Sequence, residues 1–308
     1  MRPETEPEAD DGRRPVGRLR RWIAALRLHQ WAKNLLLFVP LLLAGPSGNL
    51  ASYLMVAVGF FVFCALASAG YVINDLVDLE ADRQHRTKRH RPFAAGQLPV
   101  GHGVAGVLAL LVVATGCGIM LPPGFQLTAA VYFGGTLAYS LGLKRAPMLD
   151  VLVLAGLFSV RILAGAVLLP LPVSLWLLTF SMFLFLSLAL VKRYTELADA
   201  EGQGAATIAS RGYRVEELLL LLVIGGSSAI ASTVIFVVYL INEQFPSGVY
   251  RAPHWLWLIF PVLLFWLLRI WRLAVCGRMH DDPVMFALRD PSSLALGVVV
   301  LALLGLAW

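Results

Sequence analysis

Residues Asn74–Pro92 read NDLVDLEADRQHRTKRHRP, a run of acids and then bases that follows a long apolar segment. If the apolar helix continues through Asp82, its period of 3.6 residues brings four oxygen-bearing side chains onto about a quarter of the circumference. These side chains belong to Asn74, Asp75, Asp78 and Asp82, at about 0°, 100°, 40° and 80°. Glu80, at about 240°, lies away from them. The stretch therefore predicts a polar site at the end of a long helix.

The oxygen atoms on this face indicate a divalent metal ion. Adjacent carboxylates repel one another unless positive charge lies between them, and carboxylate and amide oxygens are ligands that Mg²⁺ prefers. Mg²⁺ usually keeps waters and binds substrate phosphates through a few carboxylates. Five cations follow that are able to neutralise such a phosphate, namely Arg83, Arg86, Lys88, Arg89 and Arg91. The alternative is a solvated charged loop, which has no need to gather its acids on one helical face.

The composition places this polar stretch in a membrane protein. Of the 308 residues, 58% are hydrophobic and 14% are charged, and the mean hydropathy is +0.75. These values are typical of a polytopic membrane protein rather than a soluble globule. Residues 1–20 lack the apolar core of a signal peptide, and we expect them to form a disordered cytoplasmic tail. Residues 21–308 are predicted to form one transmembrane domain.

Nine apolar segments approach the ~20 residues that a helix needs to cross a bilayer. We expect the first, which ends near residue 44, to continue from an interfacial helix at residues 22–33. The other eight lie at about 51–73, 100–121, 125–143, 148–169, 173–191, 218–241, 255–275 and 294–308. The predicted fold is therefore all-α, with about nine transmembrane helices.

The distribution of Lys and Arg predicts the orientation of these helices. Of the 25 cations, 23 lie before the first span or in alternate connections, whereas the opposite connections carry only Arg251. The positive-inside rule therefore predicts that the N terminus and the Asn74–Pro92 stretch face the cytoplasm. Membrane topology also accounts for the net charge of +6, so we expect no nucleic acid partner. The three cysteines are far apart and indicate neither a disulfide framework nor a zinc site.

Two clusters at predicted cytoplasmic helix ends are further candidate sites. Tyr139 and Lys144 flank the end of the fourth predicted span, where interfacial anchoring is the alternative to a functional role. Lys192, Arg193 and Glu196 lie at the end of the sixth. Their spacing also allows a purely structural Lys192–Glu196 ion pair.

Arg161 lies inside the fifth predicted span, about 16 Å along the helix from Asp150. A guanidinium at membrane depth is costly unless it faces the bundle interior and has a partner. Arg161 is therefore predicted to contact a substrate phosphate or an acid on another helix.

The sequence NDLVDLEAD at residues 74–82, followed by Arg91-Pro92, resembles the first Asp-rich motif of the UbiA superfamily of intramembrane prenyltransferases. The resemblance covers residues 22–308 and implies nine transmembrane helices around a central cavity with a cytoplasmic cap. It also implies Mg²⁺ on a diphosphate, held by Asn74, Asp78 and Asp82. Many members carry a second Asp-rich motif after the sixth helix, where this chain has KRYTE at residues 192–196.

Five further stretches are together similar to the decaprenyl-phosphate phosphoribosyltransferase branch. They are HQWAKNLLLF (29–38), YSLGLKRAPMLD (139–150), VRILAG (160–165), KRYTEL (192–197) and FALRD (286–290). The similarity implies Mg²⁺-dependent transfer of 5-phosphoribose from phosphoribosyl pyrophosphate to a polyprenyl phosphate, in cell-envelope biosynthesis at the plasma membrane. The implied catalytic residues are Asp75, Asp78, Asp82, Arg161 and Glu196. The implied substrate-binding residues are Lys33, Asn34, Lys88, Arg89, Arg91, Tyr139, Lys144, Arg161, Lys192 and Arg193.

Two alternative functions stay open at this stage. An aromatic prenyltransferase would use the same Asp-rich face to ionise a prenyl diphosphate, and would join the prenyl group to an acceptor such as 4-hydroxybenzoate. The missing second DxxxD motif argues against it. A transporter would also have buried charges such as Arg161, but its charges are expected on both sides of the membrane, whereas here they gather on one.

Overall fold

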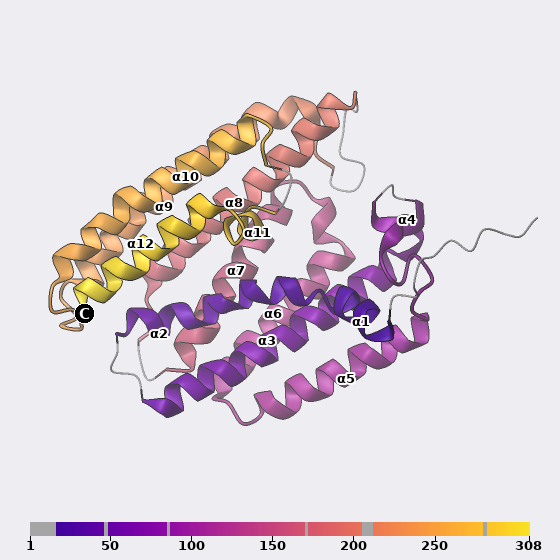
Figure 1. Ribbon diagram of the computed structural model, residues 1–308, viewed down its shortest axis with the longest axis horizontal. Helices are drawn as coiled ribbons and strands as arrows, with labels where there is room; N and C mark the ends of the chain where they lie inside the picture. Colours follow the sequence, from indigo (N-terminus) through magenta and orange to yellow (C-terminus); the bar gives the residue numbers. More distant parts are fainter. Residues whose placement is uncertain (1–16, 46–48, 85–86, 170–171, 205–211, 280–281) are drawn as a thin grey trace, which may run out of the picture.

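The computed structural model describes residues 17–45, 49–84, 87–169, 172–204, 212–279 and 282–308. The regular elements of these residues are helices (Figure 1), so the all-α prediction is confirmed. The long helices are α3 (Leu50–Val77), α5 (Val100–Gly118), α6 (Pro123–Leu141), α7 (Leu149–Val167), α8 (Leu175–Gly202), α9 (Leu218–Tyr239), α10 (Ile259–Val275) and α12 (Pro291–Ala307). The shorter elements are α1 (Arg18–Leu26), η1 (Leu28–Phe38), α2 (Val39–Leu43), α4 (Leu79–Gln84), η2 (Lys88–His90), η3 (Leu143–Arg145), η4 (Val215–Glu217), η5 (Leu240–Gln244), η6 (Pro253–Leu258) and α11 (Pro283–Ala287).

The protein is a multi-pass membrane protein, and a helix lies at each predicted apolar segment. Six helical segments of the described residues are long and apolar enough to cross a membrane, namely Leu50–Val77, Val100–Gly118, Leu149–Val167, Leu175–Gly202, Val215–Gln244 and Pro253–Val275. The other three predicted spans correspond to η1 with α2, to α6 and to the 17-residue α12. The number nine therefore stays a prediction. Residues 1–16 lie outside the described residues and α1 begins at Arg18, so the tail also stays a prediction.

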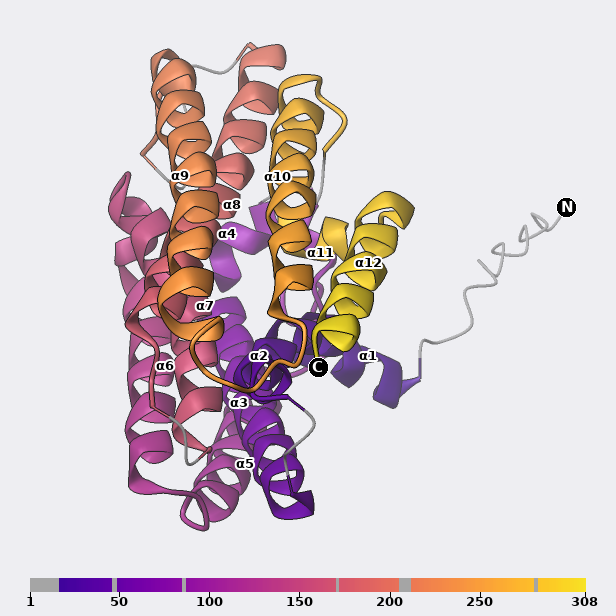
Figure 2. The same ribbon diagram turned by 90° about the vertical axis from the view of Figure 1, so that its left-hand side faces the viewer.

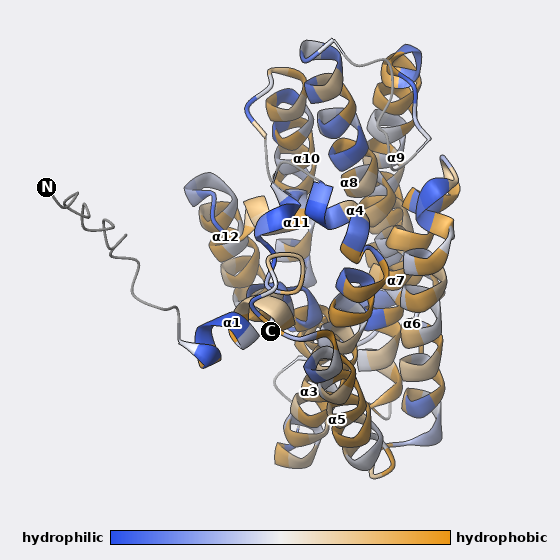
Figure 3. Ribbon diagram, turned by 90° about the vertical axis from the view of Figure 1, so that its right-hand side faces the viewer, coloured by the Kyte–Doolittle hydropathy of each residue, from blue (hydrophilic) through white to orange (hydrophobic). Residues whose placement is uncertain are grey.

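The helix ends form two sets, as alternating spans require. On one side, salt bridges join the end of α3 to η3, and α7 to α8. On the other, hydrogen bonds join the segment between η5 and η6 to the ends of α2 and α12. Figure 2 shows α8, α9 and α10 side by side, with α12 next to α10. In Figure 3, hydrophilic residues gather at α1, at α4 and at the adjacent ends of α8 and α10, whereas hydrophobic residues cover most of α3 and α5.

The N-terminal segment differs from the predicted continuous helix. Helix α1 ends at Leu26, and Arg27 adopts a φ of 51° in the left-handed region, so η1 starts in a new direction. This conformation is unfavourable for a residue with a side chain. The Arg27 guanidinium donates to Asp75 Oδ1 at 2.6 Å, and this contact holds the break against the end of α3.

Close packing of η1 against α7 sets the centre of the molecule. A Cβ atom at Gly165 would lie 2.0 Å from the carbonyl oxygen of Leu37, so only glycine permits this approach. Arg161 lies one turn before Gly165 on α7, and Asn34 lies one 3-10 turn before Leu37 on η1. The contact therefore brings Arg161 and Asn34 together.

The predicted orientation can be tested with single cysteines at two exposed positions. In a background with Cys64, Cys117 and Cys276 replaced by serine, we expect Ser247→Cys to react with an impermeant maleimide in intact cells. Gln84→Cys is expected to react only after the membrane is opened, because the positive-inside rule places it in the cytoplasm. Labelling of the Gln84→Cys protein in intact cells would reverse the orientation.

Candidate active site

The predicted polar face contains a helix break that the sequence did not reveal. Helix α3 ends at Val77 rather than continuing through Asp82, because Asp78 has a φ of −90° and a ψ of 11°. Hydrogen bonds from Asp78 N to Asn74 O (2.9 Å) and from Asp82 N to Asp78 O (2.8 Å) span the break. The i, i+4 relationship between these residues is thereby retained. With 28 residues, α3 is about 42 Å long and exceeds a hydrocarbon layer of ~30 Å, so its polar end extends beyond the bilayer core.

Lys144 of η3 bridges the side chains of Asn74 and Asp78. Its Nζ lies 2.6 Å from Asp78 Oδ2 and 3.2 Å from Asn74 Oδ1. The predicted substrate-binding lysine thus already lies at the Asp-rich face, 66 residues from Asp78 in the sequence.

Arg91 bridges the side chains of Asp75 and Asp82. Its Nη1 lies 2.6 Å from Asp82 Oδ2 and 3.1 Å from Asp75 Oδ1. Both carboxylates are buried, each with 2% of its residue surface exposed. Asp75 also accepts from Arg27, a partner for which the sequence gave no signal, because the two residues come from different helices. The acids therefore form two cation-bridged pairs, Asn74 with Asp78 and Asp75 with Asp82.

The carboxylate and amide oxygens of this face are of the kind that bind divalent cations such as Mg²⁺. No group of three or more His, Cys, Asp or Glu residues in the described part of the chain is placed to hold a metal ion. Mg²⁺, however, commonly uses one or two carboxylates together with substrate phosphates. Each pair here already surrounds a positive charge, an ammonium in one case and a guanidinium in the other. The metal site at Asn74, Asp78 and Asp82 stays a prediction.

Two of the remaining cations of the stretch follow the break on a short helix. Lys88 and Arg89 belong to the short 3-10 helix η2, and Arg89 is exposed, with its Nε 3.4 Å from His90 Nε2. Arg86 lies outside the described residues. Arg91 is a predicted phosphate-binding cation that contacts the acids directly.

Arg161 lies buried at the centre, with 6% of its surface exposed. Its Nε donates to Asn34 Oδ1 at 2.9 Å, its Nη2 to the hydroxyl of Tyr132 at 2.8 Å, and its Nη1 to the carbonyl of Leu157 at 2.6 Å. The guanidinium carbon also lies 4.6 Å and 5.1 Å from the ring centres of Tyr132 and Phe158. The salt bridges among the described residues include none to Arg161. Neutral groups orient its charge without neutralising it, which is the arrangement expected of an anion-binding side chain.

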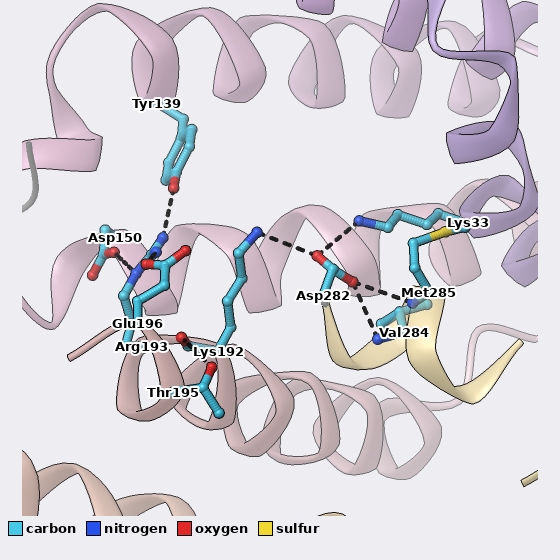
Figure 4. A network of polar contacts seen from close by, with 10 residues as sticks. All are labelled: Lys33, Tyr139, Asp150, Lys192, Arg193, Thr195, Glu196, Asp282, Val284 and Met285. Atoms are coloured by element: carbon cyan, nitrogen blue, oxygen red, sulfur yellow. Dashed lines mark hydrogen bonds and ion pairs between the residues drawn. The ribbon is translucent and has the colours of Figure 1, made fainter. Parts of the chain in front are cut away.

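Lys33 and Lys192 meet at a single carboxylate, that of Asp282 (Figure 4). Lys33 Nζ lies 3.0 Å and Lys192 Nζ 3.4 Å from Asp282 Oδ2. Lys33 Nζ is also 5.6 Å from the centre of the Phe158 ring, over which Arg161 lies as well. We call Lys33, Arg161 and Lys192 the cationic pocket, in which the two lysines share the Asp282 carboxylate and Arg161 has no ion pair among the described residues.

Asp282 was not predicted as a site residue. The sequence Asp282-Pro283 before a short apolar run is typical of a helix N-terminus, and its side chain indeed caps α11. Burial opposes its ionisation, but the two lysine ammonium groups hold the pKa of the Asp282 carboxyl at about 2. Asp282 is therefore an anion at neutral pH.

Tyr71 lies next to the polar face. It is one turn before Asp75 on α3, and the Arg27 guanidinium is 4.9 Å from its ring centre. Arg27 therefore contacts both Tyr71 and Asp75 at the end of α3.

Arg193 has a different environment from the one predicted (Figure 4). It is fully buried, and its Nε lies 2.6 Å from Asp150 Oδ2 while its Nη2 donates to the hydroxyl of Tyr139 at 3.0 Å. Its Nη1 pairs with Glu196. Two carboxylates, those of Asp150 and Glu196, thus neutralise the Arg193 guanidinium, which favours a positioning role over substrate contact. The structural alternative of a Lys192–Glu196 pair is wrong, because Glu196 pairs with Arg193 and Lys192 turns toward α11.

An apolar cavity of about 670 Å³ lies between helices of the C-terminal half and α2. Its walls come from α2, α8, α9, α10, α11 and α12, and include Val39, Leu42, Leu184, Leu188, Val284 and Leu288. One wall, α8, carries Lys192, while Asp282 caps a second, α11, and the Lys33-bearing η1 runs into a third, α2. The cavity and two of the pocket cations therefore come from the same or consecutive elements.

Comparison with known proteins places these features in a family. The UbiA prenyltransferase family matches residues 35–289. The uncharacterized protein y4nM of Sinorhizobium fredii is 42% identical over 279 residues, which cover 91% of this chain but 54% of that protein, so the chain spans about half of its length. The decaprenyl-phosphate phosphoribosyltransferase of Mycobacterium tuberculosis is 33% identical over 292 residues, 93% of this chain and 91% of the relative.

A solved structure agrees in fold. The UbiA homologue from Archaeoglobus fulgidus bound to DMAPP and Mg²⁺ superposes with a TM-score of 0.70, at 15% sequence identity, over 93% of this chain and 97% of that one. At this identity the likeness shows the arrangement of the helices. Because the family match extends over most of the sequence and the folds agree, the chain belongs to the UbiA prenyltransferase family.

Proposed function

We propose that this transferase moves 5-phosphoribose from phosphoribosyl pyrophosphate to a polyprenyl phosphate at the cytoplasmic membrane face. The observation that carries the proposal is the cationic pocket, where two lysines share one carboxylate, together with an apolar cavity lined by residues within four positions of Lys192 and Asp282. A lipid with an anionic phosphate and a polyisoprenoid tail matches both features. Similarity to the phosphoribosyltransferase of Mycobacterium tuberculosis supports the choice of donor.

The donor pyrophosphate is assigned to the Asp-rich face. Mg²⁺ bound by Asn74, Asp78 and Asp82 would supply Lewis acid and template chemistry there. Asp75 orients Arg91 through their ion pair. Lys144 and Arg91 hold the carboxylates in place before the donor binds and, with Lys88 and Arg89, neutralise the pyrophosphate.

The acceptor phosphate is assigned to the cationic pocket. An oxygen of the lipid phosphate forms a bond to C1 of the ribose while the bond from C1 to the pyrophosphate oxygen breaks, and pyrophosphate leaves with the electron pair. The acceptor is already an anion, so no general base is needed. Arg161, with its planar fork of donors, orients the phosphate of the lipid acceptor toward the ribose of the donor.

Glu196 is assigned to the ribose hydroxyls. Its side chain is 35% exposed, so the carboxylate is accessible even while Arg193 holds it from one side. Arg193 and Tyr139 are positioning residues in this scheme, because both are engaged in the network around Asp150 and Glu196.

Prenyl transfer to an aromatic acceptor is the second candidate, because the Archaeoglobus fulgidus homologue of the same fold binds DMAPP and Mg²⁺. Its transition state carries positive charge on an allylic group. Lys33, Arg161 and Lys192 would oppose that charge, whereas they favour an anionic acceptor.

An activity assay with two alternative pairs of substrates distinguishes phosphoribosyl transfer from aromatic prenyl transfer. Purified protein in lipid nanodiscs would receive Mg²⁺ with either labelled phosphoribosyl pyrophosphate and polyprenyl phosphate, or labelled prenyl diphosphate and 4-hydroxybenzoate. We expect labelled lipid from the first pair and none in EDTA. Product from the second pair alone would overturn the proposal.

Arg161→Lys is expected to lower phosphoribosyl transfer about tenfold or more, which corresponds to ~1.4 kcal/mol of transition-state stabilisation. A lysine ammonium cannot reproduce the three hydrogen bonds to Asn34, Tyr132 and Leu157 and still present a flat pair of donors to a phosphate. The measurement is kcat/KM for the lipid acceptor, with the thermal unfolding midpoint determined on the same samples. Exposed Arg251→Lys is the control and should match the wild type.

Equal activity of the Arg161→Lys protein would show that Arg161 contacts neither phosphate. Loss of folded protein would assign Arg161 to the structure of the helix bundle instead.

A further inference from the structure

The carboxylate of Asp282 has two separate tasks in the structure. Its Oδ1 accepts from the backbone N–H of Val284 at 3.1 Å and of Met285 at 3.4 Å, which caps α11. Its Oδ2 lies between the ammonium groups of Lys33 and Lys192 (Figure 4). One oxygen atom thus fixes a short helix, while the other occupies the space between two cations from distant parts of the chain.

Asp282 also stands where the apolar cavity meets the cations. Val284 and Leu288, which follow it, line the cavity, and so do Val39 after Lys33 and Leu188 before Lys192. A polyprenyl chain in this cavity would therefore present its headgroup near Asp282. The Asp282 side chain is 21% exposed, so it is not sealed behind the lysines.

We propose that Asp282 is a specificity-determining residue, whose Oδ2 occupies the anion position between Lys33 and Lys192 until the phosphate of the lipid acceptor displaces it. This inference rests on the proposed function, and it names the group that competes with the lipid phosphate for the two lysines, the Asp282 carboxylate. A phosphate oxygen satisfies the two ammonium groups as a carboxylate oxygen does. The hydroxyl of a neutral polyprenol does not, so its entry would leave buried positive charge without an anion.

Displacement of Asp282 explains how an apolar cavity can select a charged lipid. Any lipid of suitable length gains from burial of its tail, so the tail cannot distinguish a phosphate from an alcohol. The exchange of one anion for another at the lysines does distinguish them. The closed arrangement lowers the apparent affinity for the phosphate, which equals the intrinsic affinity multiplied by the fraction of time for which the pocket is open.

Asp282→Asn separates the two tasks of this side chain. Asparagine caps a helix about as well as aspartate, so α11 keeps its cap while the internal anion is removed. Asp282→Glu keeps the charge. Asp290→Asn is the matched control, because Asp290 also caps a helix and pairs with a cation, Arg269, at 2.7 Å.

The test measures binding of labelled polyprenyl phosphate and labelled polyprenol to purified protein in nanodiscs, without donor. If the pocket is closed for about nine-tenths of the time, Asp282→Asn will lower the Kd for polyprenyl phosphate about tenfold. We expect the Kd for polyprenol to change much less. The Asp290→Asn protein is expected to bind polyprenyl phosphate as the wild type does, and the Asp282→Glu protein, which keeps the internal anion, is expected to bind it less tightly than the Asp282→Asn protein.

A second measurement keeps Asp282 in place. A spin label on Arg289→Cys, in the cysteine-free background, reports on the chain just after α11 from an exposed position that is not among the lining residues of the cavity. Polyprenyl phosphate is expected to change its spectrum, and polyprenol is not. An unchanged spectrum with bound polyprenyl phosphate would overturn displacement, even if the Asp282→Asn protein failed to fold.

The outcomes also separate this inference from the proposed function. If the wild type binds both lipids alike, phosphate recognition by the cationic pocket fails and the proposed function fails with it. If the wild type prefers the phosphate but folded Asp282→Asn binds it no more tightly, only the role of Asp282 is overturned.

Discussion

Asp78→Asn and Asp82→Asn are each expected to abolish measurable turnover, a loss on the order of 10²–10³-fold, while the protein stays folded. Asparagine has the shape of aspartate and keeps an oxygen that Lys144 or Arg91 can contact, so the local packing survives. It lacks the negative charge that Mg²⁺ requires of its ligands at a pyrophosphate. The loss should therefore appear in kcat, with little change in the thermal unfolding midpoint.

Glu80→Gln is the matched control for these two variants. Glu80 belongs to the same acidic stretch but is exposed, and the helical spacing places it away from the polar face. Its activity should remain near that of the wild type, and the activity of the wild type should be lost in EDTA and restored by Mg²⁺. Full activity of either Asn variant, or activity that EDTA does not change, would refute the metal role of this face.

Asp150→Ala is expected to destabilise the protein by about 3–5 kcal/mol, the usual cost of removing one partner from a buried ion pair. Asp150 and Arg193 are both fully buried and lie 2.6 Å apart. Asp150 Oδ1 also accepts from the hydroxyl of Tyr213 at 2.5 Å, and that hydroxyl accepts from Met148 N at 2.8 Å. The substitution thus leaves a buried guanidinium short of an anion and a tyrosine hydroxyl without its acceptor.

The free energy of unfolding in mixed detergent micelles measures this effect. Glu216→Gln serves as the control, because the Arg214–Glu216 pair is exposed and spans 3.4 Å, and such pairs contribute little. Asp150→Asn should fall between Asp150→Ala and the wild type, since it keeps an acceptor for Tyr213. Wild-type stability of the Asp150→Ala protein would mean that the buried network does not hold the ends of α7 and α8 together.

The parts of the site that the sequence predicted depend on local spacing. Asn74, Asp78 and Asp82 follow one another at intervals of four residues, and the hydrogen bonds across the break after α3 preserve this relationship. The apolar segments likewise reveal the helices because burial in lipid requires about twenty apolar residues in succession. The break itself, at Asp78, has no Pro or Gly to mark it.

The contacts between residues on different helices could not be predicted from the spacing of residues along the sequence. Lys33 and Asp282 are 249 residues apart, and the sequence contains nothing that couples them. Lys192 and Arg193 looked equivalent as phosphate ligands, yet neighbouring residues on a helix point about 100° apart. One therefore faces Asp150 inside the bundle, and the other faces Asp282 at the cavity.

The most direct test of phosphoribosyl transfer is the mass of the product formed in competition. The purified wild-type protein would receive phosphoribosyl pyrophosphate, polyprenyl phosphate, prenyl diphosphate and 4-hydroxybenzoate together, with Mg²⁺. We expect polyprenyl phosphate that has gained one 5-phosphoribosyl group, with release of pyrophosphate. Prenylated 4-hydroxybenzoate as the sole product would contradict phosphoribosyl transfer and establish the aromatic prenyltransferase instead.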